Sequence, residues 1–390
     1  MRASNGRKAT KFRNMHVLSA NSLRWRPMSE CRSDKSSGHM RIAVALQGGG
    51  SHGAFTWGVL DRLLLEPNLE IIGISGTSAG AMNAAVLADG LRRGGRSEAR
   101  TALASYWDGV GGLPGYASFE ALPFPGSVLS WSLDNNPLFL WMDMLARICS
   151  PYQANPGNYN PLRTLLERID FEGLRRDQDA PRVFIGTTNV RSGLRRVFDN
   201  SELSIDVLLA SACLPSAYQA VEIDGEYYWD GGYTGNPPLA PIYLRTNATD
   251  LVIIGINPLV RADVPKTARE IINRIDEISF NSAFITELAA IAFIEEIAKD
   301  RVRRMFMHII NDKALDTLGG SSKVNNKRTF LEHLRKIGWR AAENWIEANL
   351  RFIGERSTVD LTGLLPLQDG LFKDPVGVRQ RLQTSDHGTQ

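Results

Sequence analysis

The chain has 390 residues, of which 43% are hydrophobic, so it can build a sizeable core in one large domain or two smaller ones. Its formal net charge is +3, but residues 1–40 contain nine Lys or Arg against two Asp or Glu, and the remainder contains 36 against 40. The basic character therefore belongs to the N-terminal segment, and a nucleic-acid-binding surface on the rest of the chain is not indicated.

The three cysteines, Cys31, Cys149 and Cys213, are too few and too scattered for a disulfide framework, and no pair has the spacing of metal ligands. We expect a cytoplasmic setting, no metal site and no cofactor. No apolar run approaches the roughly 20 residues that span a bilayer, and the N-terminus lacks the apolar core of a secretory signal. The sequence thus predicts a protein that is soluble or contacts membranes peripherally.

Residues 1–40 are rich in Arg, Ser, Lys and Asn and lack periodic apolar positions, which predicts a disordered tail. Three interpretations remain open for this tail. It is an extension without function, with Met40 as an alternative start, or a transit peptide, or a basic arm for lipid head groups.

The structured domain is expected over residues 41–365. Residues 41–47 form an apolar strand, a glycine-rich turn follows, and residues 54–65 carry a helical pattern. A second strand at residues 70–75 leads into another helix. Strand, helix, parallel strand and helix in this order predict an α/β fold with three α/β/α layers and a mainly parallel central sheet.

Residues 105–160 differ in character, because aromatic residues alternate with Pro, Gly and Asn without sustained periodicity. We interpret this segment as an insertion over the candidate site. It is either an excursion of the core or an apolar lid or acyl-chain channel. The aromatic residues concerned are Tyr106, Trp107, Tyr116, Phe119, Phe124, Trp131, Phe139, Trp141 and Tyr152.

The second half of the chain resumes the sheet and ends in helices. Asp224-Gly225 suits a two-residue turn, so it predicts a hairpin that delivers Asp230-Gly231-Gly232 at its exit. The further strands are expected at residues 183–190, 194–198, 251–256 and 305–310. Helices are expected at residues 203–212, 265–299 and 329–349, and a tail at residues 366–390.

The most informative segment runs from an apolar strand through Gly76-Thr77-Ser78-Ala79-Gly80 into an alanine-rich helix. A nucleophile elbow needs this arrangement, because a sharp turn exposes the serine oxygen and only small neighbours let the strand and helix pack closely. Gly76 and Gly80 meet that requirement. Ser78 is therefore a candidate nucleophile.

A serine nucleophile needs donors for the oxyanion and a base for its proton. Gly48-Gly49-Gly50 lies between a strand and a helix, where backbone N–H groups are free to approach an oxyanion. The same glycines match a dinucleotide-binding pattern, but no acidic residue ends the second strand, and no Gly-Lys-Ser/Thr indicates a P-loop.

No histidine of the six in the chain stands at a strand exit followed by a flexible loop, but Asp230 does. A carboxylate bonded directly to Ser78 can take its proton, and partial burial raises its basicity. Asp-Gly-Gly by itself is more often an ordinary turn.

The order of glycine-rich turn, serine elbow and Asp-Gly-Gly resembles the patatin-like acyl hydrolases over roughly residues 41–257. The segments at residues 188–193 and at Asn236-Pro237 also look like those of that family. The resemblance implies a lipid acyl hydrolase with Ser78 as nucleophile, Asp230 as general base in a Ser-Asp dyad, and the oxyanion loop at residues 48–50.

The resemblance implies a lipid or other acyl-ester substrate, most commonly a phospholipid. Intracellular polyesters and simple glycerides remain alternatives, as does a non-catalytic membrane-associated scaffold. One position departs from the family, because its glycine-rich loop commonly carries Arg or Lys where this chain has His52. His52 either supports the loop when protonated, which would make activity pH-sensitive, or is a structural histidine.

Overall fold

A computed structural model describes residues 39–114, 131–134, 136–259, 261, 264–297 and 304–359 of the chain, and these belong to one compact unit. The two predicted tails lie outside the described residues, apart from His39 and Met40. Tyr116, Phe119 and Phe124 of the predicted insertion also lie outside them.

The centre of the fold is an eight-stranded sheet with the order β5-β6-β3-β2-β1-β7-β8, in which β4 pairs with β3. Five neighbouring strands are parallel and the hairpin strands at one end are antiparallel, which confirms the mainly parallel sheet. The parallel strands are β1 (Met40–Leu46), β2 (Leu69–Gly76), β3 (Arg182–Asn189), β7 (Asp250–Ile254) and β8 (Phe306–Ile310). The antiparallel strands are β4 (Arg195–Asp199), β5 (Val221–Ile223) and β6 (Glu226–Asp230).

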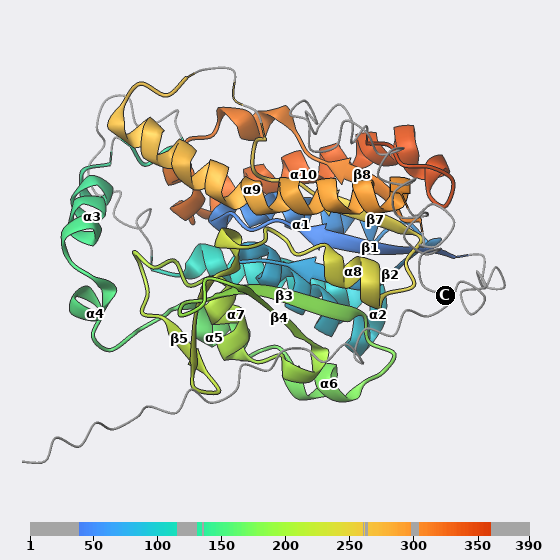
Figure 1. Ribbon diagram of the computed structural model, residues 1–390, viewed down its shortest axis with the longest axis horizontal. Coiled ribbons are helices and arrows are strands. Elements are labelled where there is room, and N and C mark those ends of the chain that lie inside the picture. The colour runs from blue at the N-terminus through green and yellow to red at the C-terminus, as the bar shows by residue number, and fades with distance from the viewer. Residues whose placement is uncertain are drawn as a thin grey trace, which may run out of the picture. The chain divides into compact units, whose positions relative to one another are not determined.

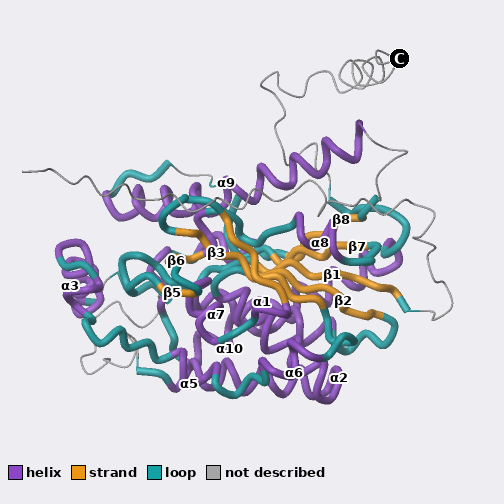
Figure 2. Tube along the Cα trace, turned by 60° about the horizontal axis from the view of Figure 1, so that its bottom comes forward, coloured by secondary structure: helices purple, strands orange, loops and turns teal. Residues whose placement is uncertain are grey.

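Helices cover both faces of this sheet, as Figure 2 shows. One face carries α1 (Gly53–Leu63), α2 (Ala79–Gly112), α5 (Leu162–Leu166), α6 (Phe171–Arg176), α7 (Ile205–Ser211) and α10 (Arg328–Asn349). The other carries α8 (Ala240–Arg245) and α9 (Ala268–Ile297). The three-layer α/β/α architecture is thereby confirmed. Two further helices, α3 (Pro137–Ile148) and α4 (Pro151–Ala154), lie beside the sheet at one end of it (Figure 1).

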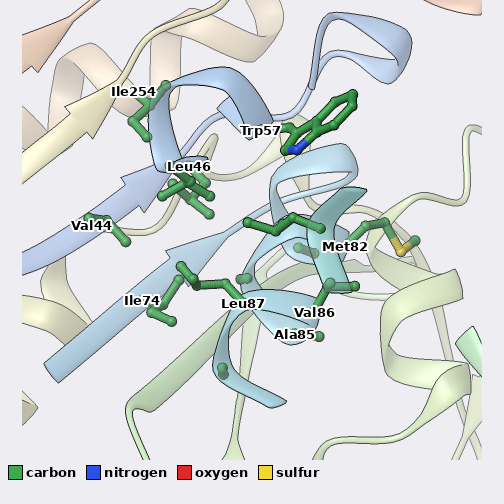
Figure 3. Packing of buried hydrophobic residues seen from close by; sticks show 14 of the residues in the cluster. Val44, Leu46, Trp57, Ile74, Met82, Ala85, Val86, Leu87 and Ile254 are labelled. Atoms are coloured by element: carbon green, nitrogen blue, oxygen red, sulfur yellow. The ribbon is translucent and has the colours of Figure 1, made fainter. Parts of the chain in front are cut away.

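Alternation along β1 explains why the two layers differ. Ile42, Val44 and Leu46 belong to the larger core cluster, and Ala43 and Ala45 belong to the smaller one. Because successive strand residues point to opposite faces, the large side chains pack under α1 and α2 and the alanines let α8 and α9 approach. Figure 3 shows the larger cluster, with Val44 and Leu46 beside side chains of α2.

The first residues of the predicted insertion lie in helix α2. Helix α2 continues to Gly112, with non-helical angles at Gly94 and Gly95, so residues 105–112 are part of a core helix. Tyr106 and Trp107 are buried there. In contrast, α3 leaves Trp141 56% exposed and Ile148 73% exposed. The interpretation as part of the core therefore applies to Tyr106 and Trp107. Helix α3, in contrast, leaves large apolar side chains exposed to solvent.

Helix α9 contains one stretch, Glu270–Glu295, that by length and composition alone is apolar enough to cross a membrane, and 28% of its most apolar part is buried. Charged residues interrupt this stretch, so it is not the continuous apolar run that the sequence analysis excludes. One of them, Glu287, is buried and paired with Arg195. Phe284 and Leu288 of α9 pack into the smaller core cluster.

Candidate active site

Ser78 lies at the bend between β2 and α2, as the elbow motif predicts. Its φ of 55° and ψ of −123° are unusual for a residue with a side chain, and its surface is half-exposed. A Cβ at Gly80 would lie 2.0 Å from the Leu46 carbonyl oxygen, and one at Gly76 would lie 2.4 Å from the Gly80 carbonyl oxygen. Larger residues at these two positions would therefore push β2 and α2 apart and disrupt the turn.

The predicted hairpin brings Asp230 to the same edge of the sheet. Asp224 and Gly225 have φ angles of 52° and 80°, which form the expected tight turn between β5 and β6. Asp230 then pairs with Thr187 of β3, while Gly76 pairs with Ile185 of the same strand. The ends of β6 and β2 therefore lie near the same end of β3, one on each side of that strand.

The carboxyl group of Asp230 is 2% exposed, and hydrogen bonding with the Ser78 hydroxyl is one of the influences on its pKa. The N–H of Gly232 donates to Asp230 Oδ1 at 2.7 Å. Burial raises the pKa of Asp230 to about 6, although these two hydrogen bonds act in the opposite direction. A carboxylate in this state is a stronger base than an exposed one and is still ionised at neutral pH.

The negative charge of Asp230 also raises the pKa values of two neighbouring side chains. Burial, and next the nearby Asp230 carboxylate, raise the pKa of Tyr233 to about 12 and that of Cys213 to about 12. Both groups are therefore neutral at physiological pH. Asp230 is the one ionised group among these three.

The glycine-rich loop lies beside Ser78, and its glycines have different roles. A Cβ at Gly48 would lie 2.7 Å from the Cβ of Ser78, so only glycine fits there. The N–H of Gly48 donates to Asn236 Oδ1 at 2.6 Å and is not available to an oxyanion. Gly48 thus belongs to the loop but is not one of its free donors.

The other two glycines remain candidates for oxyanion binding. Within the described part of the chain, the N–H groups of Gly49 and Gly50 have no hydrogen-bond partner. They precede helix α1 through the 3₁₀ helix η4 (Gly50–His52), whose N-terminal end favours negative charge. Gly50 has a φ of 59° and is exposed, so a substrate can approach it.

Two side chains that contact the backbone of Ser78 and of the glycine-rich loop have no signal in the sequence. Ser211 Oγ accepts a hydrogen bond from the Ser78 N–H at 2.9 Å and donates to the Gly186 carbonyl oxygen at 2.7 Å. Asn257 Nδ2 donates to the Gly48 carbonyl oxygen at 2.8 Å. Asn236, in contrast, belongs to a segment that the resemblance includes.

His52 is buried and neutral in this structure. Burial, together with the positive charges of Lys323 and Arg261, lowers its pKa to about 3. Its Nε2 lies 2.7 Å from Ser322 Oγ, which itself donates to the Gly319 carbonyl oxygen, so Nε2 is the donor. These contacts support the interpretation of His52 as a structural histidine. Its side chain carries no positive charge near neutral pH.

No group of three or more His, Cys, Asp and Glu side chains is placed to hold a metal ion in the described ranges. The described residues around Ser78 provide its partly exposed hydroxyl, the buried Asp230 carboxylate and the unpaired N–H groups of Gly49 and Gly50. Acyl transfer by a serine nucleophile requires groups of these kinds.

The family model of patatin-like phospholipases matches residues 44–243, which is about half of the chain. The chain belongs to the patatin-like phospholipase family, whose members are lipid acyl hydrolases. A search of curated proteins finds no match. Among solved structures, VipD from Legionella pneumophila is similar, with 13% identity, a TM-score of 0.33, and coverage of 90% of this chain and 81% of that one.

Proposed function

We propose that the protein cleaves carboxylic ester bonds of lipids, as a phospholipase A or lipase, with Ser78 as nucleophile and Asp230 as general base. The observation that carries this proposal is the contact between a half-exposed Ser78 hydroxyl and a buried carboxylate whose pKa is raised to about 6. An aspartate in an ordinary turn is exposed to solvent. Asp230 is instead buried beside Ser78, although 152 residues separate the two in the sequence. Its expected place of action is the cytoplasm, in contact with a lipid surface.

In the first half of the reaction, Ser78 Oγ attacks the ester carbonyl carbon while Asp230 accepts the hydroxyl proton. The carbonyl oxygen becomes an oxyanion that the two free N–H groups of the loop bind. The bond from carbon to the leaving alcohol then breaks, and Asp230 returns its proton to that alcohol. This leaves an acyl ester on Ser78.

In the second half, water attacks the acyl ester and Asp230 accepts the proton of the water. The second tetrahedral intermediate releases the fatty acid and restores the Ser78 hydroxyl with the proton from Asp230. A single buried carboxylate therefore serves both steps, since each step takes a proton and gives it back.

Exposed apolar side chains support a lipid substrate. Helices α3 and the first half of α9 lie at the same end of the sheet in both views (Figures 1 and 2). Trp141 and Met144 are 56% and 54% exposed, as are Ile275 and Ile278 at 56% and 52%. Phe280 of α9 also contacts Tyr233 next to the dyad, with the two ring centroids 5.1 Å apart. Exposed apolar side chains of this kind are better suited to binding a lipid surface than a small soluble ester.

Hydrolysis of p-nitrophenyl butyrate tests the chemistry separately from the lipid. We expect Ser78→Ala and Asp230→Asn each to lower kcat by about 10⁴ or more, because loss of one member of such a unit removes most of its catalysis. Mass spectrometry of the products from phospholipid, triglyceride and polyester substrates then identifies the ester class. A folded Ser78→Ala variant with full activity refutes the assignment, and an inactive wild type would favour the scaffold.

A further inference from the structure

A cationic side chain, Lys323, lies behind the glycine-rich loop and is not part of the proposed dyad. Lys323 is in the 3₁₀ helix η10 (Gly320–Val324), which packs against η4. A Cβ at Gly50 would lie 2.2 Å from the Lys323 carbonyl oxygen, so the two backbones are in contact. The loop therefore rests on η10.

The Lys323 side chain reaches the loop by a different route. Its Nζ donates to Asn257 Oδ1 at 2.9 Å, and Asn257 Nδ2 donates to the Gly48 carbonyl oxygen at 2.8 Å. Asn257 is buried, so an amide oxygen without a partner there would be strongly unfavourable. The ammonium group thus selects one of the two orientations of the amide.

The orientation of this amide matters for the charge near the loop. Asn257 Oδ1 lies 3.5 Å from the position that a Cβ of Gly49 would occupy. An amide oxygen this close to Gly49 carries partial negative charge next to the loop whose N–H groups would bind an oxyanion, and a cation bonded to that oxygen offsets this charge. The charges that face Lys323 are Glu277 and Asp276 from α9 and Arg261, and Glu277 is itself paired with Arg261.

We propose that Lys323 is a positioning residue, whose ammonium group holds the Asn257 amide so that the Gly48 carbonyl is fixed and the free N–H groups of the loop face the ester carbonyl oxygen. This inference rests on the proposed function. Lys323 is far from the loop in sequence, and in this proposal it supplies the positive charge that the neutral His52 does not provide.

Steady-state kinetics with p-nitrophenyl butyrate test the inference. We expect Lys323→Met to lower kcat by about 10²-fold, as loss of one oxyanion donor does, with KM changed by less than about threefold. Lys323→Arg keeps the charge and should retain at least about a tenth of the wild-type kcat. Lys313→Met, which alters an exposed lysine nearby, is the control and should behave as the wild type. An unchanged kcat for Lys323→Met, or an Arg variant as impaired as the Met variant, overturns the inference.

A double-mutant cycle asks whether Lys323 acts through Asn257. We expect Lys323→Met to have little further effect on kcat in the Asn257→Ala background, whereas independent roles would make the two losses multiply. Multiplicative losses overturn the inference.

The pH dependence of the Arg variant covers the case in which Lys323→Met does not fold. Burial lowers the pKa of Lys323, so kcat of the wild type should fall at alkaline pH as this lysine loses its proton, and the Arg variant should lack that fall. The same alkaline fall in both proteins overturns the inference. If Ser78→Ala is active, the proposed function fails; if Ser78→Ala is inactive but Lys323 has no effect, only this inference fails.

Discussion

Two buried aspartates lie in opposite halves of the sheet, Asp230 in β6 and Asp250 in β7, and their surroundings differ. Asp250 begins β7 and accepts hydrogen bonds from His308 Nε2 at 2.9 Å, from the Gly354 N–H at 3.0 Å and from Thr249 Oγ1 at 2.6 Å. Asp230 ends β6 and has the Gly232 N–H and the Ser78 hydroxyl. Burial of a carboxylate is favourable only where hydrogen bonds replace the lost water.

The comparison contrasts an aspartate whose hydrogen bonds are satisfied, Asp250, with one that under the proposed function must accept a proton, Asp230. Asp250 and His308 are both fully buried and join β7 to β8 and to the segment at Gly354, so their contacts hold the chain together. Asp230 has fewer partners, and burial leaves its proton affinity high. A carboxylate that must accept a proton cannot also have all its lone pairs satisfied.

The largest effect on stability is expected from His308→Ala. Removing this partner leaves the Asp250 carboxylate buried and incompletely paired, which should lower the free energy of unfolding by about 3–5 kcal/mol. Chemical denaturation measures the change, and kcat of the folded fraction should stay at the wild-type value. His39→Ala, at an exposed histidine, is the control. Wild-type stability of His308→Ala would remove the distinction between the two aspartates.

Asp230→Asn should raise the free energy of unfolding at alkaline pH, whereas His308→Ala should lower it. Because the folded-state pKa of Asp230 is raised to about 6 from 3.8, its contribution to stability is complete below pH 4 and is lost as the pH rises through 6. The Asn variant avoids that loss. We expect it to be more stable than the wild type by up to about 3 kcal/mol at pH 8 and equally stable near pH 4. A less stable Asn variant at pH 8 would show that the Asp230 carboxylate is satisfied in the way that Asp250 is.

Much of the fold could be predicted because its signals are local. The elbow at Ser78 and the turn at Asp224-Gly225 each depend on a few adjacent residues, and the strands follow from short apolar runs. The helical state of residues 105–112 could not be predicted, because aromatic residues without clear periodicity give no helix signal, although Gly94 and Gly95 do mark the kink that the structure has within α2.

The supports of the site depend on contacts between distant residues. Ser211 meets Ser78 across 133 residues, and Asn257 meets Gly48 across 209. A single serine, asparagine or lysine gives no signal of such a partner. The sequence predicts that Ser78 and Asp230 lie at one edge of the sheet, whereas the network behind the loop depends on how η10 packs against η4.

The pH dependence of fluorophosphonate labelling at Ser78, followed by peptide mapping, tests the pairing of Ser78 with Asp230 most directly. We expect the second-order rate constant to rise about tenfold for each pH unit below an apparent pKa of about 6, to level off above it, and to be lost in Asp230→Asn. A rate constant without an inflection near pH 6, or an Asn variant labelled as fast as the wild type, would contradict this pairing.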